Sequence, residues 1–266
     1  MSPSGPARIN ADAPSSAPEV QAQLGRPRLH LRQTDSTNER ARELAIAGAP
    51  HGTLVTAAEQ SAGRGRQGRV WSAPPGSSIL MSLLLRSPPA LLPLMAAVAV
   101  CDVVGERARI KWPNDIVVAA DASAEPPALA KLAGILVEGR PQEGWAVLGI
   151  GVNVAVRLEE LPAELQPGQE TGARSAATMG LSRDQIEPLL ARLLDALQRR
   201  LAESAEETLR AWRARDALRG REIAWNAGQG VADGIDGEGR LVVALDGGGH
   251  TALAAGEVHL QRIAPD

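Results

Sequence analysis

Seven residues, 63–69 with the sequence GRGRQGR, have the composition of an anion-binding loop. Glycine reaches positive φ and lets the backbone approach a ligand closely. The planar arginine fork fits carboxylate and phosphate oxygens. No apolar residue interrupts the stretch, so it has little surface to bury. The pattern predicts a mobile, positively charged loop that binds an anion.

Two other interpretations of this Gly/Arg loop (residues 63–69) stay open on these residues alone. One is a solvated basic turn. The other is a disordered nucleic-acid segment, although such segments normally come as long repeats with interspersed aromatic residues. Here there is one copy, in a chain of formal net charge −3. The charge disfavours the nucleic-acid interpretation.

Lysine and asparagine are scarce, which draws attention to the places where they occur. Among 28 basic residues only Lys111 and Lys131 are lysines. Three of the five asparagines, Asn38, Asn114 and Asn153, lie in polar stretches next to predicted strands. These positions, together with the loop, make the first set of candidate functional residues.

The composition indicates an ordinary soluble globular protein. The 266 residues suffice for one large domain, or for a medium and a small one. A pI near 5.9 argues against a general polyanion binder. The single cysteine, Cys101, lies in an apolar stretch, which predicts a buried thiol. Because no apolar run reaches transmembrane length and no signal pattern opens the chain, we expect a cytoplasmic protein.

The elements that must position these residues can be predicted from the pattern of apolar residues. Residues 1–26, rich in Pro, Ser and Ala, predict a disordered tail. Ser36 and Glu39 have the spacing of a capping box, which predicts a helix start. Strands are predicted at 28–31, 52–57, 78–86, 131–138 and 145–154, and helices at 91–104, 183–201 and 204–215. Within 109–118 an extended segment, a polar corner at Asn114-Asp115 and another strand are predicted. From residue 218 short strands alternate with glycine turns, at 222–225, 230–235, 240–245 and 257–260, which predicts a small β-barrel domain.

Five motifs in this order resemble those of the biotin protein ligases. They are TDSTN over residues 34–38, EQSAGRGRQGR over 59–69, KWPND over 111–115, KLAGILVE over 131–138 and GIGVN over 149–153. The resemblance spans about residues 28–263. It implies an α+β fold in which 27–217 form a catalytic domain like that of class II aminoacyl-tRNA synthetases, with a mainly antiparallel mixed sheet flanked by helices. It also implies that 218–266 form an SH3-like domain.

The reaction implied by the resemblance joins biotin to ATP and then transfers the biotinyl group to a carrier lysine. A carboxylate must approach a triphosphate, so positive charge is required. By resemblance, Lys131, Arg66 and Asp115 are catalytic, and Asp115 orients or deprotonates the acceptor amine. The implied biotin-binding residues are Ser36, Thr37, Asn38, Gln60, Arg64, Gly65, Arg66 and Lys131. The implied ATP-binding residues are Arg66, Arg69, Trp71, Lys111, Asn114 and Asn153, with Trp71 offering a face to adenine.

The resemblance further implies Mg²⁺ with ATP, through ligands that the sequence does not identify, and a biotin carboxyl carrier protein as partner. The residues before the first predicted strand are too few and too rich in proline for a helix-turn-helix, so we expect no specific DNA binding. Because no apolar run is long enough to span a membrane, we also expect no membrane association. The sequence leaves a homodimer open. A lipoate ligase of the same fold is the nearest alternative. The other two alternatives are a nucleic-acid-binding module and an inactive homologue that acts as a chaperone for the carrier domain.

Overall fold

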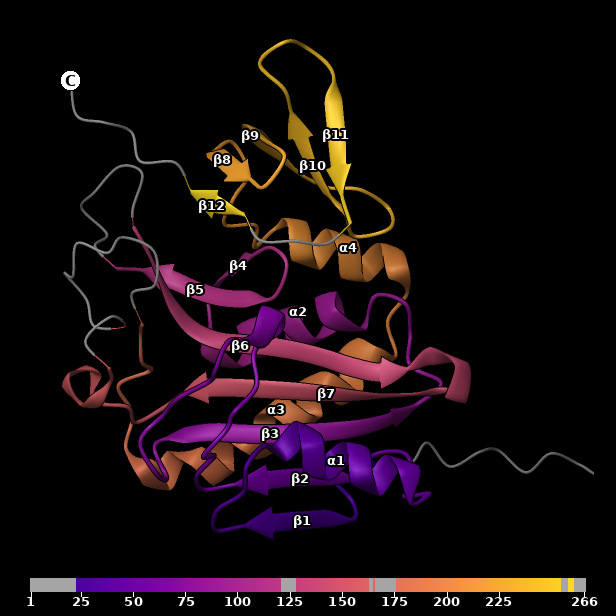
Figure 1. Ribbon diagram of the computed structural model, residues 1–266, viewed down its shortest axis with the longest axis vertical. Helices are drawn as coiled ribbons and strands as arrows, with labels where there is room; N and C mark the ends of the chain where they lie inside the picture. The colour runs from indigo at the N-terminus through magenta and orange to yellow at the C-terminus, as the bar shows by residue number, and fades with distance from the viewer. Residues whose placement is uncertain (1–22, 121–127, 163–164, 166–175, 255–257, 261–266) are drawn as a thin grey trace, which may run out of the picture.

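A computed structural model describes residues 23–120, 128–162, 165, 176–254 and 258–260. Its largest element is a seven-stranded sheet in the order β1-β2-β3-β7-β6-β5-β4 (Figure 1). The strands are β1 (Arg28–Leu31), β2 (Leu54–Ala57), β3 (Ser78–Arg86), β4 (Arg109–Lys111), β5 (Asp115–Ala119), β6 (Leu129–Arg140) and β7 (Trp145–Asn153). β1 pairs with β2 in parallel, and the other pairs are antiparallel. The predicted mixed, mainly antiparallel sheet is therefore confirmed.

Helices cover both faces of this sheet (Figure 1). α1 (Thr37–Ile46) packs Ala41 and Ala45 on one face, against side chains that include Val147. α2 (Leu92–Val104) and α3 (Ile186–Leu201) cover the other face, where the main hydrophobic core lies. β3 and β7 are apolar along most of their length. Their aliphatic side chains make up a large part of this core. Short 3-10 turns occur at Arg66–Gly68, Pro141–Glu143, Leu158–Glu160 and Arg183–Gln185.

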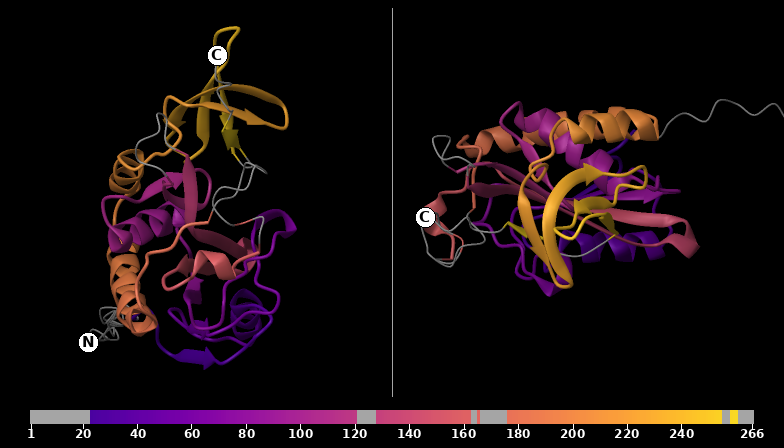
Figure 2. Two further views of the ribbon diagram at one scale, coloured as in Figure 1. Left: turned by 90° about the vertical axis from the view of Figure 1, so that its left-hand side faces the viewer. Right: turned by 90° about the horizontal axis from the view of Figure 1, so that it is seen from above.

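A second, wholly antiparallel sheet follows α4 (Ala205–Arg213) and lies at one end of the molecule, beyond β4 (Figures 1 and 2). Its order is β11-β10-β9-β8-β12. The strands are β8 (Glu222–Trp225), β9 (Gly228–Ile235), β10 (Leu241–Ala244), β11 (His250–Leu253) and β12 (His259–Leu260). The sequence predicted four of these strands and missed β11.

The two sheets are joined by direct contacts rather than by the chain alone. Trp112, in the turn between β4 and β5, donates its indole N–H to the carbonyl of Gly239 over 3.1 Å. Gly239 has φ of 77°, and a Cβ there would come 2.7 Å from Leu94 of α2. The Arg213 guanidinium at the end of α4 donates to the carbonyl of Ile235 over 2.9 Å. The turn that carries the KWPND motif therefore packs against the second sheet.

Two predictions near the N-terminus are wrong in detail. Ser36 is the N-cap of α1 but its side chain makes no cap hydrogen bond, so the predicted capping box is absent. Instead, the side-chain oxygen Oε1 of Gln60 accepts a hydrogen bond from the backbone N–H of Thr37 over 2.7 Å. The predicted tail over 1–26 also extends too far, because Leu24 is buried in the main core. The remainder of that tail, 1–22, lies outside the described residues.

Within the described part of the chain, the longest helices fall short of the length and apolarity that crossing a membrane requires.

Candidate active site

The candidate site lies on the face of the main sheet that α1 covers. Val147 packs against α1, and side chains alternate between faces along a strand, so Gly149 and Gly151 point to the same side. Across the sheet, Ser82 pairs with Gly149, and Gly134 pairs with Gly151. Glycine at these positions leaves room above the sheet for other side chains.

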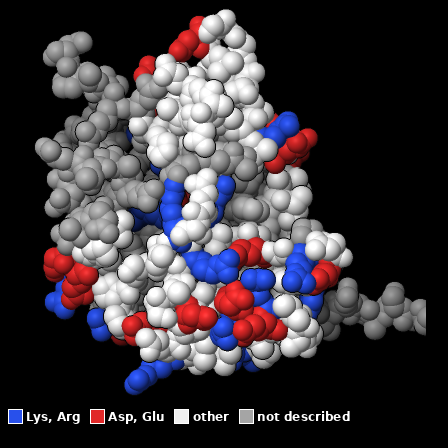
Figure 3. Space-filling view, in the orientation of Figure 1, with Lys and Arg blue, Asp and Glu red and all other residues white. Residues whose placement is uncertain are grey.

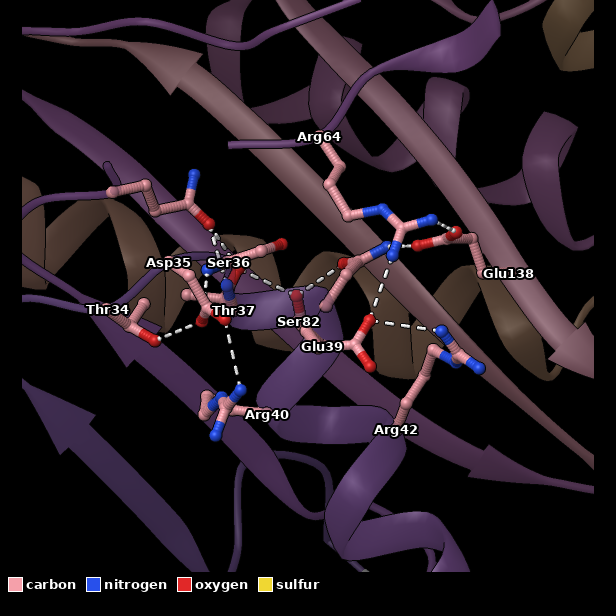
Figure 4. A network of polar contacts seen from close by, with 12 residues as sticks. Thr34, Asp35, Ser36, Thr37, Glu39, Arg40, Arg42, Arg64, Ser82 and Glu138 are labelled. Atoms are coloured by element: carbon pink, nitrogen blue, oxygen red, sulfur yellow. Dashed lines mark hydrogen bonds and ion pairs between the residues drawn. The ribbon is translucent and has the colours of Figure 1, made fainter. Parts of the chain in front are cut away.

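A set of uncharged hydrogen-bonding groups fills the space between α1 and β3 (Figure 4). Gln60 accepts hydrogen bonds from the backbone N–H and hydroxyl of Thr37, at 2.7 and 3.0 Å. The Ser82 hydroxyl lies 2.8 Å from the Thr37 hydroxyl and 2.5 Å from Asn38 Oδ1. Gly149 is required beneath them, because a Cβ there would collide with Asn38 Oδ1. Thr37, Asn38, Gln60 and Ser82 are called the polar pocket below.

The Gly/Arg loop forms a short hairpin over this pocket rather than an irregular segment. Gly65 donates its N–H to the Arg69 carbonyl over 2.8 Å, and Trp71 donates to Gly63 over 2.9 Å. The tip turns through Gln67 and Gly68, with φ of 55° and 73°. The left-handed backbone at two successive positions explains why a glycine follows the glutamine.

The indole of Trp71 lies flat on the paired glycines of β6 and β7. A Cβ at Gly151 would come 2.6 Å from the ring, and a Cβ at Gly134 would come 3.0 Å from it. The indole Nε1 is buried and has no hydrogen-bond partner among the described residues. The Lys131 ammonium lies 5.6 Å from the ring centroid. This places an aromatic wall between the polar pocket and the charged groups that follow.

Charged groups converge beside Trp71. Lys131 Nζ lies 2.6 Å from Asp115 Oδ1, and the two side chains are 36% and 22% exposed. Burial lowers the pKa of Arg66, while the negative charge of the nearby Asp115 raises it. The guanidinium nevertheless stays protonated because its intrinsic pKa is so high. Two cations and one carboxylate therefore share this part of the site.

Three further predicted ATP-binding residues surround the charged groups. Lys111 is half-buried and lies opposite Asp115 in the backbone register of β4 and β5. The Asn114 amide donates to the carbonyl of Ile135 over 2.9 Å. The buried Asn153 amide donates to the carbonyl of Ala177, also over 2.9 Å. In this structure both amide N–H groups brace the backbone around the site.

Three residues that the sequence did not indicate contact predicted ones. Ser36 is buried beside Thr37, and Arg64 forms ion pairs with Glu39 and Glu138. Glu39, Ser82 and Glu138 were not predicted as site residues. The signal for Ser82 was a lone polar residue inside the apolar strand ILMSLLL. Glu138 ends the motif over 131–138, in which only the lysine indicated a functional role.

The arrangement can bind a small molecule with a polar, uncharged head and an anionic tail. The polar pocket supplies donors and acceptors but no net charge, whereas Lys131 and Arg66 supply positive charge beyond Trp71. Lys and Arg side chains also gather around a hollow near the middle of this face (Figure 3). Among the described residues no group of three or more His, Cys, Asp or Glu side chains has the arrangement of a metal site.

Comparison with known proteins agrees with this geometry. Residues 30–154 match the model of the Biotin/lipoate A/B protein ligase family. The biotin–acetyl-CoA-carboxylase ligase of Mycobacterium tuberculosis is 34% identical over 253 residues, covering 86% of this chain and 87% of that protein. The bifunctional ligase/repressor BirA of Bacillus spizizenii is 39% identical over 155 residues, which cover 54% of this chain. The match spans only 45% of the length of that Bacillus relative, and 41% of its Bacillus subtilis counterpart.

A solved structure gives the same result for the fold. The biotin protein ligase of Aquifex aeolicus, in complex with biotin and ATP, has a TM-score of 0.68 and 25% identity to this chain. The likeness covers 88% of this chain and 98% of that one. Since the mycobacterial relative is matched over most of both lengths, and the fold and site agree, the chain belongs to the biotin protein ligase family.

Proposed function

We propose that this protein is a biotin–protein ligase that activates biotin with ATP and transfers it to a lysine of a biotin carboxyl carrier protein. One observation carries the proposal: the uncharged polar pocket and a cationic cluster, Lys131 and Arg66 beside Asp115, occupy one face of the sheet with the Trp71 ring between them. Biotin has the matching polarity, with a ureido head that hydrogen-bonds at one end and a carboxylate at the other.

In the first half-reaction a biotin carboxylate oxygen attacks the α-phosphorus of ATP, forming biotinyl-5′-AMP and releasing pyrophosphate. Both reactants are anionic, so Lys131 and Arg66 lower the barrier by stabilising negative charge as the bond forms. The residues Ser36, Thr37, Asn38, Gln60, Arg64, Gly65, Arg66 and Lys131 bind biotin in this proposal. The ATP-binding residues are Arg66, Arg69, Trp71, Lys111, Asn114 and Asn153.

In the second half-reaction the acceptor lysine amine attacks the acyl carbon, and AMP leaves. A lysine amine is mostly protonated at pH 7, since its reference pKa is about 10.4. Asp115, beside Lys131, is the carboxylate proposed to orient this amine or take its proton. The Gly/Arg loop covers the mixed anhydride and keeps water from it.

Magnesium fits this site only as a companion of ATP. Mg²⁺ keeps several waters and is normally held by substrate phosphates with one or two carboxylates. Asp115 is the carboxylate at the cationic cluster, and it is paired with Lys131. We therefore assign most of the ion's ligands to phosphate and water, and its chemistry would be to neutralise phosphate charge.

Several broader expectations belong to the same proposal. The main sheet with its helices would be a class II aminoacyl-tRNA synthetase-like domain over 27–217, and the second sheet an SH3-like barrel over 218–266. The five antiparallel strands after α4 support the latter. We also expect a cytoplasmic location, no specific DNA binding and a homodimer. Cell fractionation, a gel shift and analytical sedimentation test these three expectations.

The deciding experiment is isotope exchange between pyrophosphate and ATP. Exchange is expected with biotin and absent with lipoate, because a dithiolane ring would leave the polar pocket unsatisfied. Lys131→Ala serves as the control that separates this enzyme from a contaminating ligase. Exchange with lipoate alone would favour the lipoate ligase, and no exchange with either acid would overturn the proposal.

A further inference from the structure

The carboxylate of Glu138 lies between the polar pocket and the Gly/Arg loop (Figure 4). Its Oε2 accepts a hydrogen bond from Asn38 Nδ2 over 2.8 Å. Its Oε1 lies 2.8 Å from Arg64 Nη2. The side chain is 21% exposed, so both contacts are partly shielded from water. One residue of β6 therefore touches a pocket residue and a loop residue at the same time.

The first contact fixes the orientation of an amide. A carboxylate can only accept hydrogen bonds, whereas an asparagine amide presents an acceptor on one side and donors on the other. Glu138 therefore requires the NH₂ group of Asn38 to face it. That leaves Oδ1 facing the Ser82 hydroxyl, which lies 2.5 Å away. Without Glu138 the amide could turn over and present the opposite pattern of donor and acceptor to a ligand.

The second contact holds the loop. The Arg64 guanidinium is gripped from two sides, by Glu138 of β6 and by Glu39 of α1, whose Oε2 lies 2.9 Å from Nη1. Glu39 also pairs with Arg42 over 3.0 Å. These two carboxylates and two guanidinium groups balance in charge. The Arg64 side chain is thus directed at carboxylates of the protein rather than at the cationic cluster of Lys131 and Arg66.

We propose that Glu138 is a positioning residue that sets the orientation of the Asn38 amide and anchors the Gly/Arg loop through Arg64, so that pocket and loop are coupled. The inference rests on the proposed ligase function and adds a residue to it. It also gives the Arg64 side chain the role of a loop anchor, leaving ligand contact at this position to the backbone.

The test is Glu138→Gln, which keeps the size of the side chain but offers only one acceptor oxygen. Glutamine can satisfy Asn38 or Arg64, but not both. We expect the KM for biotin to rise about tenfold, corresponding to about 1.4 kcal/mol, with kcat and the KM for ATP changed by less than about threefold. Ligand-free trypsin digestion should cut faster after Arg64, Arg66 and Arg69. Glu106→Gln, an exposed carboxylate between α2 and β4, is the matched control.

A donor–acceptor swap separates the two contacts. When Asn38→Asp is combined with Glu138→Gln, the glutamine amide can donate to the carboxylate introduced at position 38 while its oxygen accepts from Arg64. Resistance to trypsin should return to the wild-type rate, while biotin binding stays weak because the pocket has lost a donor. Unchanged trypsin resistance and unchanged biotin KM in the single variant would overturn the inference, as would a rise in the KM for ATP equal to that for biotin.

Two arrangements keep the outcome interpretable. Trypsin digestion without ligand tests the loop anchor independently of catalysis. If wild-type protein shows no biotin-dependent exchange, the proposed function fails, but the digestion rates still show whether Glu138 anchors the loop. If Glu138→Gln does not fold, Arg64→Gln breaks the same link from the loop. It should also speed cleavage after Arg66 and Arg69, and normal resistance there would contradict the anchor.

Discussion

Lys131 and Asp115 form an ion pair of 2.6 Å between neighbouring strands of the main sheet. The pair depends on an irregularity: the register of β5 against β6 shifts between Ile116 and Val117. Each partner keeps the other in place beside Trp71. A reacting carboxylate or phosphate must therefore compete with Asp115 for the lysine, which ties the two proposed catalytic residues together.

Lys131→Ala should reduce biotin-dependent pyrophosphate exchange by about 100-fold or more. The change removes a positive charge that the forming acyl phosphate needs and takes away the ion-pair partner of Asp115. The melting temperature should change little, because the lysine side chain is only partly buried. Near-normal exchange in a folded variant would remove Lys131 from the catalytic set.

Asp115→Asn should separate the half-reactions. Adenylate formation is expected to stay within about tenfold of wild type, since Lys131 and Arg66 are retained. Transfer to a carrier protein should fall further, because the amine loses the carboxylate that orients it. Exchange measures the first step, and single-turnover transfer from preformed adenylate measures the second. Equal losses in both would contradict the acceptor role of Asp115.

Gly151→Ala should displace the Trp71 ring, because the new methyl carbon would lie 2.6 Å from its Cε2 atom. Displacement of the ring should lower the rate of biotin-dependent exchange by about 10- to 100-fold, because the reactants lose their alignment. Exchange rates and tryptophan emission would both report the change. Gly237→Ala is the matched control, since a Cβ there meets nothing within 4 Å. Wild-type kinetics in Gly151→Ala would show that the ring position is unimportant.

The bidentate pair between Arg28 of β1 and Glu187 of α3, both contacts 2.7 Å, makes stability depend on pH. The hydrogen bonds from Arg28 lower the pKa of Glu187 from 4.5. Stabilisation is therefore present above the unfolded pKa and is lost as pH falls through the lowered folded value. The glutamate is 62% exposed, so the pair contributes at most about 1 kcal/mol.

Urea denaturation of Glu187→Gln should accordingly show a small loss of stability at pH 7 that shrinks on acidification. A loss that grows as the pH falls would contradict the assignment.

Cys101 provides a probe of opening. The thiol is fully buried, and burial raises its pKa to about 12. Because the thiolate is the reactive form, native protein should not react with a disulfide reagent at pH 8. Labelling should appear with the urea transition followed by circular dichroism. Cys101 is the chain's single cysteine, so Cys101→Ser gives the blank. Rapid labelling of native protein would show that α2 opens without global unfolding.

Much of the fold followed from local patterns in the sequence. β3 is entirely buried but for its last residue, and its bounds, Ser78–Arg86, match the predicted run. β11 was missed because His250–Leu253 alternates weakly and its pairing with β10 is a long-range contact. The predicted tail included Leu24 because residues 1–26 have few large apolar side chains, yet Leu24 reaches the core through tertiary packing.

The candidate site was predictable where a residue type is chemically distinctive, as for Lys131 and the Gly/Arg loop. It was not predictable where the site depends on contacts between residues that are far apart in the sequence. Glu138 and Asn38 are 100 positions apart, and nothing local shows that their side chains meet. The capping role of Gln60 is equally invisible, since the helix it caps begins 23 positions earlier.

The hydrogen bond from Trp112 to Gly239 changes how a harmful substitution far from the site should be interpreted. Gly239 has a left-handed backbone that any side chain would strain, and a Cβ there would also displace the buried Leu94 side chain of α2, so a substitution would disturb the turn whose carbonyl accepts the Trp112 N–H. The turn carrying Lys111, Asn114 and Asp115 would lose its support. An allele altered at Gly239 would therefore give the phenotype of a catalytic mutation, although the residue lies in the turn between β9 and β10 of the second sheet.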